Sequence, residues 1–165
     1  MSSERELVSL AAEVLRALKH RGMTLAVAES CTGGLIGHLL TEIPGSSEVF
    51  LGGAITYHNR LKTELGVDPA VLESEGAVST RVAEAMAAGV RRQTGAGIGL
   101  AVTGIAGPGG GSETKPVGLT YVAVADAAGV ASEGHIWRAD RSTNKLLSAG
   151  AALKLALTRL AQSER

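Results

Sequence analysis

Apolar residues recur at intervals of three and four near both ends of the chain. Near the start they stand at Leu7, Leu10, Ala11, Val14, Leu15 and Leu18. This spacing places them on one face of a helix, so an amphipathic helix is predicted over 4–21, with Gly22 at its end. Near the other end, one side of a last helix that begins near Arg141 carries Leu146, Leu153, Leu157 and Leu160.

Five short apolar runs between these two helices have the length of strands: 24–28, 50–57, 98–102, 119–125 and 130–137. The last two runs predict a hairpin, because only the turn signal 126–129 separates them. Helix signals separate the others. They predict helices that end near Thr41, that cover 59–65, that begin after Asp68-Pro69, and that run from the cap Ser79 to about Thr94.

Strands that alternate with helices predict an α/β fold. The hairpin adds antiparallel pairing, so the sheet is expected to be mixed and mostly parallel. No internal repeat, linker or low-complexity segment interrupts the pattern. One domain over 1–165 is therefore predicted.

The charge balance argues against nucleic acid as a partner. Sixteen basic residues offset sixteen acidic ones, whereas phosphate contacts from a basic surface supply most of the affinity for nucleic acids. One Trp, two Tyr and one Phe are also too few for a base-stacking platform.

The sequence favours a cytoplasmic protein that neither spans nor binds a membrane. Cys31 is the only cysteine, so no disulfide can form within the chain. The segment 1–22 is charged and amphipathic, unlike a signal peptide. The longest uncharged stretch is too rich in glycine for a membrane helix. Association into a homo-oligomer stays open.

Polar residues directly after a buried strand are candidates for chemistry, because α/β proteins place their sites at the carboxyl ends of strands. Ser30 follows the first strand within Glu-Ser-Cys-Thr-Gly-Gly, at a turn into a helix. Helix N–H groups there can stabilise an anion or oxyanion. Alternatively, Ser30 or Thr32 only caps the helix. Cys31 could be the nucleophile instead of Ser30, although a free cysteine is more often a small buried apolar residue.

A second polar cluster follows the strand 50–57. Lys62 lies five residues after Tyr57, so a strand end and one helical turn can direct both into one cleft. A buried lysine with a lowered pKa can act as the general base for a serine. The alternative is that Arg60 and Lys62 are solvated charges on a helix face, as most lysines are.

The third candidate is the glycine-rich segment 103–118, whose backbone N–H groups can bind phosphate. It lacks the Gly-Lys-Ser/Thr ending of a P-loop, and a tight structural loop is the alternative. Arg141 begins a helix and can reach a phosphate, while Asp140 fits a helix cap. The four histidines and Cys31 show no metal-ligand spacing, so neither a metal nor a cofactor is expected.

Taken together, these segments resemble one family. In order, they are Ala-Glu-Ser-Cys-Thr-Gly-Gly (28–34), Tyr-His-Asn-Arg-Leu-Lys (57–62), Gly-Ala-Val-Ser (76–79), Thr-Gly-Ile-Ala-Gly-Pro-Gly-Gly-Gly-Ser (103–112), Lys-Pro-Val-Gly (115–118) and Asp-Arg (140–141). Nearly the whole chain resembles the CinA C-terminal domain family, the nicotinamide-nucleotide amidases.

The resemblance implies a three-layer α/β/α fold and a hydrolase that acts on a linear amide C–N bond. Its substrate would be nicotinamide mononucleotide, and its products nicotinic acid mononucleotide and ammonia. The family's nucleophile falls on Ser30, and its lysine and tyrosine fall on Lys62 and Tyr57. The residues expected to contact the substrate are Thr32, Gly33, Gly34, Thr103, Gly104, Gly107, Gly109, Gly110 and Arg141.

Two features qualify this resemblance. Many members carry the amidase domain behind a larger N-terminal domain that is linked to pyrophosphatase activity. The resemblance here covers only the amidase domain, so no pyrophosphatase activity is expected from this chain. The family often has a second arginine where this chain has Lys145, and phosphate binding by Arg141, Lys145 or loop amides therefore stays open. The alternative function is a non-catalytic nucleotide-binding or regulatory module.

Overall fold

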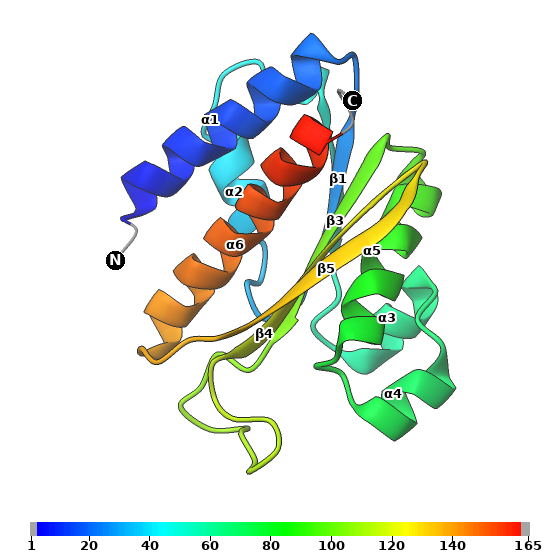
Figure 1. Cartoon of the computed structure of the whole chain (residues 1–165), viewed down its shortest axis with the longest axis vertical. Helices are drawn as coiled ribbons and strands as arrows, with labels where there is room; N and C mark the ends of the chain where they lie inside the picture. Colours follow the sequence, from blue (N-terminus) through cyan, green and yellow to red (C-terminus); the bar gives the residue numbers. More distant parts are fainter. Residues whose placement is uncertain (1–2, 163–165) are drawn as a thin grey trace.

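The computed structural model describes residues 3–162, in which one sheet lies between two layers of helices (Figure 1). The elements in chain order are α1 (Glu4–His20), β1 (Leu25–Glu29), α2 (Leu35–Thr41), η1 (Ser46–Glu48), β2 (Phe50–Ile55), α3 (Asn59–Leu65), α4 (Pro69–Glu75), α5 (Thr80–Thr94), β3 (Ile98–Gly104), β4 (Leu119–Asp126), β5 (Gly129–Ile136) and α6 (Arg141–Gln162).

The five strands of the sheet have the order β2-β1-β3-β4-β5. β1 pairs in parallel with both β2 and β3, whereas β4 is antiparallel to both β3 and β5. All strands except β4 therefore point the same way, which confirms the mixed, mostly parallel sheet. The carboxyl ends of β1, β2 and β3 consequently meet at one edge.

Each face of the sheet packs against its own group of helices, which confirms the three-layer arrangement (Figure 1). On one face, branched residues of β1, β3 and β4 pack against α1, α2 and α6. On the other, α5 lies against alanines of the same strands, among them Ala28 and Ala101. Gly99 permits this close approach, since a Cβ there would lie 2.0 Å from the Ala87 carbonyl oxygen.

The predicted helices and strands agree with the observed ones to within two residues at each end. The caps predicted at Ser79 and Asp140 are also confirmed. The Ser79 hydroxyl accepts from the N–H of Val82 at 3.2 Å, and Asp140 accepts from the N–H of Thr143 at 2.8 Å. No helix within residues 3–162 combines the length and the apolar character that crossing a bilayer requires.

Candidate active site

Ser30 and Lys62 meet at the edge where the parallel strands end. Ser30 directly follows β1, and Lys62 lies on α3, which begins four residues after β2 ends. Because β1 and β2 are parallel neighbours, both segments leave the sheet side by side. The Lys62 Nζ lies 3.0 Å from the Ser30 Oγ, a hydrogen-bond distance.

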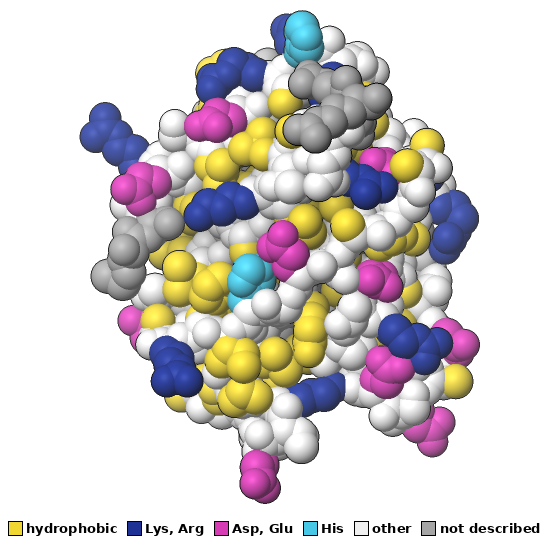
Figure 2. All heavy atoms as spheres, viewed as in Figure 1, with side chains coloured by type: hydrophobic (Ala, Val, Ile, Leu, Met, Phe, Trp, Pro, Cys, Tyr) yellow, Lys and Arg dark blue, Asp and Glu magenta, His cyan; other side chains and the backbone are white. Residues whose placement is uncertain are grey.

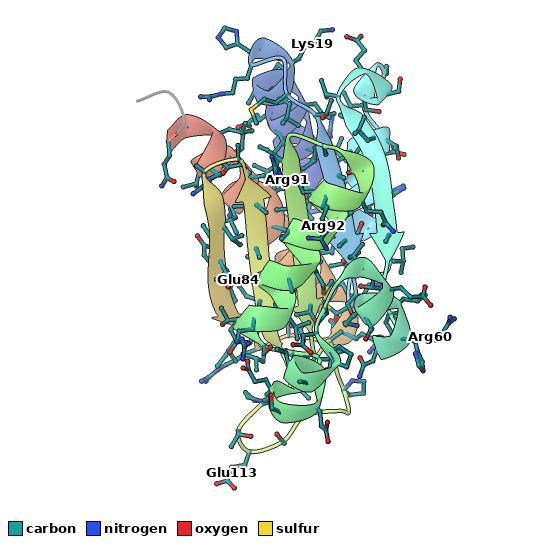
Figure 3. The ribbon with its side chains drawn as sticks, turned by 90° about the vertical axis from the view of Figure 1, so that its right-hand side faces the viewer. Lys19, Arg60, Glu84, Arg91, Arg92 and Glu113 are labelled. Atoms are coloured by element: carbon teal, nitrogen blue, oxygen red, sulfur yellow. The ribbon has the colours of Figure 1, made fainter. Side chains whose placement is uncertain are left out.

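Lys62 is among the most deeply buried side chains of the described chain, at 1% exposure. Its Nζ also donates to the Thr56 carbonyl oxygen at 2.5 Å, and no carboxylate within residues 3–162 forms an ion pair with it. Burial therefore lowers the pKa of Lys62 below its ordinary value. The alternative of a solvated helix-face charge is wrong for Lys62, whereas Arg60 is exposed (Figure 3).

The neighbouring thiol has the opposite tendency. Cys31 is buried, and the loss of hydration raises its pKa to about 12. A thiol is a good nucleophile only as the thiolate. The buried apolar interpretation therefore suits Cys31 better than a nucleophilic one.

The turn that follows Ser30 is not capped as the sequence suggested. The Ser30 hydroxyl faces Lys62, and α2 begins after Gly34, whose φ of 100° is in the left-handed region. The carboxylate of Glu29 reaches forward and accepts from the N–H groups of Gly34, Ile36 and Gly37. The caps proposed for Ser30 and Thr32 are therefore wrong, because Glu29 occupies the start of the helix.

That arrangement also affects the expected oxyanion donors. The N–H of Gly33 donates to the Ser30 carbonyl oxygen at 3.0 Å, and that of Gly34 donates to Glu29. Of the three N–H groups over 32–34, only that of Thr32 lacks a hydrogen bond within the described residues. The Thr32 hydroxyl itself donates to Glu29 at 2.6 Å.

A cavity of about 190 Å³ opens beside the Ser30–Lys62 pair. Its walls come from the ends of β1 and β3, from α3, from the link between α4 and α5, and from the start of α6. The lining residues are Ser30, Cys31, Tyr57, Asn59, Lys62, Ala77, Val78, Thr103, Gly104, Ala106 and Arg141. Five segments far apart in the sequence thus converge on one site.

The structure brings six of the twelve candidate residues to this cavity and leaves six outside its lining. Inside are Ser30, Tyr57, Lys62, Thr103, Gly104 and Arg141; outside are Thr32, Gly33, Gly34, Gly107, Gly109 and Gly110. Sequence reasoning did not single out Asn59, Ala77, Val78 or Ala106. All four lie within the motifs quoted above, but the apolar wall residues Ala77, Val78 and Ala106 carry no chemical signal of their own.

Tyr57 and Arg141 lie together at the mouth of the cavity. Tyr57 is 62% exposed, and its hydroxyl accepts from the Arg141 Nη2 at 3.1 Å. The Arg141 Nη1 donates to the Gly107 carbonyl oxygen at 2.6 Å. Arg141 therefore joins the tyrosine to the glycine-rich loop, a contact that the sequence did not indicate.

Two side chains, one from α6 and one from the loop itself, hold the glycine-rich loop in place. Asn144 donates to the Ala106 carbonyl oxygen at 3.0 Å. Lys115 donates to the carbonyl oxygens of Glu75 and Val78, which ties the loop to the end of α4. Only the tip projects from the molecule, where Figure 3 shows Glu113 pointing away from the other elements. The loop is thus a fixed wall of the cavity.

No group of three or more His, Cys, Asp or Glu side chains within residues 3–162 is placed to hold a metal ion. Figure 2 shows both signs of charge scattered over the face formed by α1, α6 and β5, with no continuous basic stripe on that face.

Known proteins resemble this chain over nearly all of its length. The model of the CinA C-terminal domain matches residues 7–160. A CinA-like protein of Synechococcus sp. (strain RCC307) is 55% identical over 150 residues, which are 89% of this chain and 36% of that protein. A CinA-like protein of Chlorobaculum tepidum is 47% identical over 95% of this chain and 38% of its own length. The chain thus spans about a third of the length of these curated relatives.

Two solved structures are similar over more than nine-tenths of their length. The competence/damage inducible protein CihA from Agrobacterium tumefaciens superposes with a TM-score of 0.91 at 39% identity, covering 98% of each chain. A competence-damaged protein (CinA) superfamily protein from Escherichia coli gives a TM-score of 0.89 at 28% identity, over 95% of this chain and 93% of that one.

Proposed function

The chain belongs to the CinA C-terminal domain family, and from this premise we propose that it hydrolyses the carboxamide of nicotinamide mononucleotide to nicotinic acid mononucleotide and ammonia. The observation that carries the proposal is the contact of 3.0 Å between Ser30 Oγ and the buried Nζ of Lys62. A module that only binds a nucleotide has no need of a serine paired with a lysine of lowered pKa.

In the proposed reaction, Ser30 Oγ attacks the carboxamide carbon while its proton passes to neutral Lys62. The tetrahedral intermediate then expels ammonia, which takes the proton from Lys62, and an acyl-serine remains. Water attacks this ester while Lys62 takes one of its protons, and Lys62 then returns that proton to Ser30 Oγ as the acid leaves. The Thr56 carbonyl oxygen supports this cycle, because an Nζ–H held there turns the nitrogen lone pair toward Ser30.

Two further roles belong to the proposal. The oxyanion is assigned to the N–H of Thr32, the one such group over 32–34 that no other described residue uses. Tyr57, held by Arg141, is assigned to orienting the substrate or relaying a proton at the mouth of the cavity. Thr103 and Gly104 form the opposite wall.

The substrate phosphate is assigned to Lys145 together with Arg141. Lys145 lies near enough to the cavity for its charge to act on the Cys31 thiol. Its side-chain ammonium makes no hydrogen bond or ion pair with another described residue, whereas two nitrogens of Arg141 already donate to Gly107 and Tyr57. A free ammonium can therefore turn to a dianion without breaking a contact. Amides of Gly109 and Gly110 are the remaining candidates.

We expect purified protein to release ammonia from nicotinamide mononucleotide much faster than from nicotinamide riboside or nicotinamide. Loss of the phosphate removes binding energy that positions the carboxamide, so both rate and affinity should fall. Lys145→Ala should lower kcat/KM for the mononucleotide roughly ten- to a hundredfold, the value of one charge-assisted contact, and leave the riboside unaffected.

The matched control is Lys154→Ala, because nine residues along a helix place Lys154 on the side of α6 opposite Lys145. Equal kcat/KM for mononucleotide and riboside would contradict the phosphate site. Binding of the nucleotide without any ammonia release would favour the regulatory module instead.

A further inference from the structure

Glu29 is a buried carboxylate next to the proposed nucleophile, and the reaction described above gives it no role. It ends β1, is 1% exposed, and forms no ion pair with a described residue. Four donors surround its two oxygens. Oε2 accepts from the Thr32 hydroxyl at 2.6 Å and from the N–H groups of Gly34 at 3.2 Å and Ile36 at 3.1 Å, and Oε1 accepts from that of Gly37 at 2.9 Å.

These contacts determine the path of the chain after Ser30. Backbone N–H groups can only donate, so both carboxylate oxygens must accept, and the positive end of α2 compensates the buried charge. The two glycines of the turn, Gly33 and Gly34, have φ of 60° and 100° and impose no preference of their own. The carboxylate therefore supplies the restraint that the glycines lack.

The backbone of Glu29 helps to position Lys62, through Thr56. Its carbonyl oxygen accepts from the N–H of Thr56 at 2.7 Å, and the carbonyl oxygen of Thr56 accepts from Lys62 Nζ. One residue thus fixes the turn that carries Ser30 through its side chain and the partner of Lys62 through its backbone.

We infer that Glu29 is a positioning residue of the proposed amidase reaction, and that its carboxylate holds Ser30 Oγ in line with Lys62. An ordinary helix cap would be a short side chain at the start of α2 and would not depend on the preceding strand. Here the restraint comes from the residue before the nucleophile. It acts through Ser30 and touches neither the substrate nor Lys62.

Glu29→Gln keeps the shape of the side chain but places an NH₂ group against at least one of the four donors. We expect kcat to fall roughly ten- to a hundredfold, as for a reacting group displaced by about 1 Å. KM should stay within about twofold, because no substrate contact changes. Glu84→Gln is the control: Glu84 is a carboxylate on α5 (labelled in Figure 3) that accepts from the Ser132 hydroxyl and does not line the cavity.

A smaller change tests the same contact if Glu29→Gln fails to fold. Thr32→Val removes the hydrogen bond of 2.6 Å to Glu29 while keeping the side-chain volume, and Thr32→Ser restores it. The valine variant should lose kcat several-fold with KM unchanged, and the serine variant should regain it. Equal kcat in both variants would overturn the inference.

The cysteine beside Ser30 supplies a readout that needs no turnover. Cys31 is the only cysteine of the chain and lies in the turn that Glu29 restrains. Iodoacetamide should alkylate it at least several-fold faster in Glu29→Gln than in the wild type and the Glu84→Gln control. An unchanged alkylation rate would overturn the restraint, as would a fall in kcat that appears only with a matching rise in KM. A wild-type protein without amidase activity would contradict the proposed function, and the alkylation rates would still decide whether Glu29 holds the turn.

Discussion

At the scale of single residues, the adjacent side chains of Ser30 and Cys31 differ in their expected reactivity as nucleophiles. Both line the cavity, but Lys62 contacts the hydroxyl, while burial keeps the thiol protonated. Ser30→Ala should therefore reduce ammonia release by about a thousandfold or more, as loss of a hydrolase serine does. Cys31→Ala should retain activity within about tenfold. An active Ser30→Ala protein with an inactive Cys31→Ala protein would assign the nucleophile to the thiol.

The lowered pKa of Lys62 predicts how activity depends on pH. Because burial disfavours the charged form, the folded-state pKa lies below the value in the unfolded chain, and the neutral base forms at a lower pH. We expect kcat/KM to rise as pH increases through this lowered pKa and then to level off. The measurement is a pH–rate profile on the mononucleotide.

Lys62→Arg tests the same role, because arginine keeps its proton throughout the accessible pH range. This variant should be nearly inactive at every pH, with a far-ultraviolet circular dichroism spectrum like that of the wild type. Substantial turnover with an unchanged pH profile would exclude Lys62 as the base.

At this scale, the sequence identified the residues whose side chains can act as a nucleophile or a base. Ser30 follows one apolar run, Lys62 lies five residues after the end of another, and the family resemblance joined them. The sequence did not predict that Glu29 occupies the start of α2, because a glutamate before a serine is also typical of an exposed strand end. It likewise could not indicate that Arg141 contacts Tyr57, since 84 residues separate them.

At the scale of elements, the packing of α5 against α3 positions Lys62. Gly89 of α5 lies so close to the end of α3 that a Cβ there would stand 2.1 Å from the Leu65 carbonyl oxygen. In an unhindered helix, Gly→Ala stabilises by about 1 kcal/mol. Here the clash should reverse that sign and shift α3.

Gly89→Ala is therefore expected to lower both the melting temperature and kcat. Gln93→Ala, at an exposed position of the same helix, should change neither. Thermal unfolding and steady-state kinetics of the two variants measure the effect. A stabilised and fully active Gly89→Ala protein would show that α3 is not held by this contact.

The glycine-rich loop illustrates what an element's sequence leaves undetermined. Its composition is compatible with a phosphate cradle or a structural turn, and the sequence favoured neither. Asn144 and Lys115 fix the loop through carbonyl oxygens on both sides. These contacts join segments more than thirty residues apart, so no local pattern could have indicated them.

At the scale of the whole molecule, an ion pair joins the β4–β5 turn to the last helix. Asp126 accepts from Arg159 through both oxygens at 2.7 Å, and the two side chains are only 8% and 17% exposed. The hydrogen bonds from Arg159 are the largest cause of a lowered Asp126 pKa. This stabilisation is complete above the unfolded-state pKa, about 3.9, and is lost as pH falls through the lower folded-state value.

Asp126→Asn should accordingly reduce the free energy of unfolding by about 2 kcal/mol at pH 7, the value of a charge-assisted contact. The difference between variant and wild type should shrink as the pH falls below about 3.9. Urea titrations at neutral and acidic pH provide the comparison. A difference that is independent of pH would attribute the effect to the turn hydrogen bonds of Asp126 rather than to its charge.

The fold was predictable from the sequence to a greater extent than the site. Each apolar run became a strand, and the predicted hairpin is the antiparallel β4–β5 pair, whereas the antiparallel pairing of β3 with β4 was not predicted. The strand order was not predictable, because β1 is flanked by strands that follow it by about 25 and 75 residues. That order decides which strand ends are neighbours and hence which polar residues meet.

The central place of β1 has a consequence for how the protein folds. Its register joins Leu25 to Phe50 and to Ile98, so both neighbours must close long loops before the strand is enclosed. Non-local pairing of this kind slows folding. The cavity also needs α6, which begins at Arg141, about 110 residues after Ser30. A nascent chain therefore cannot complete the lining around Ser30 and Lys62 until α6 has emerged from the ribosome and packed against the sheet.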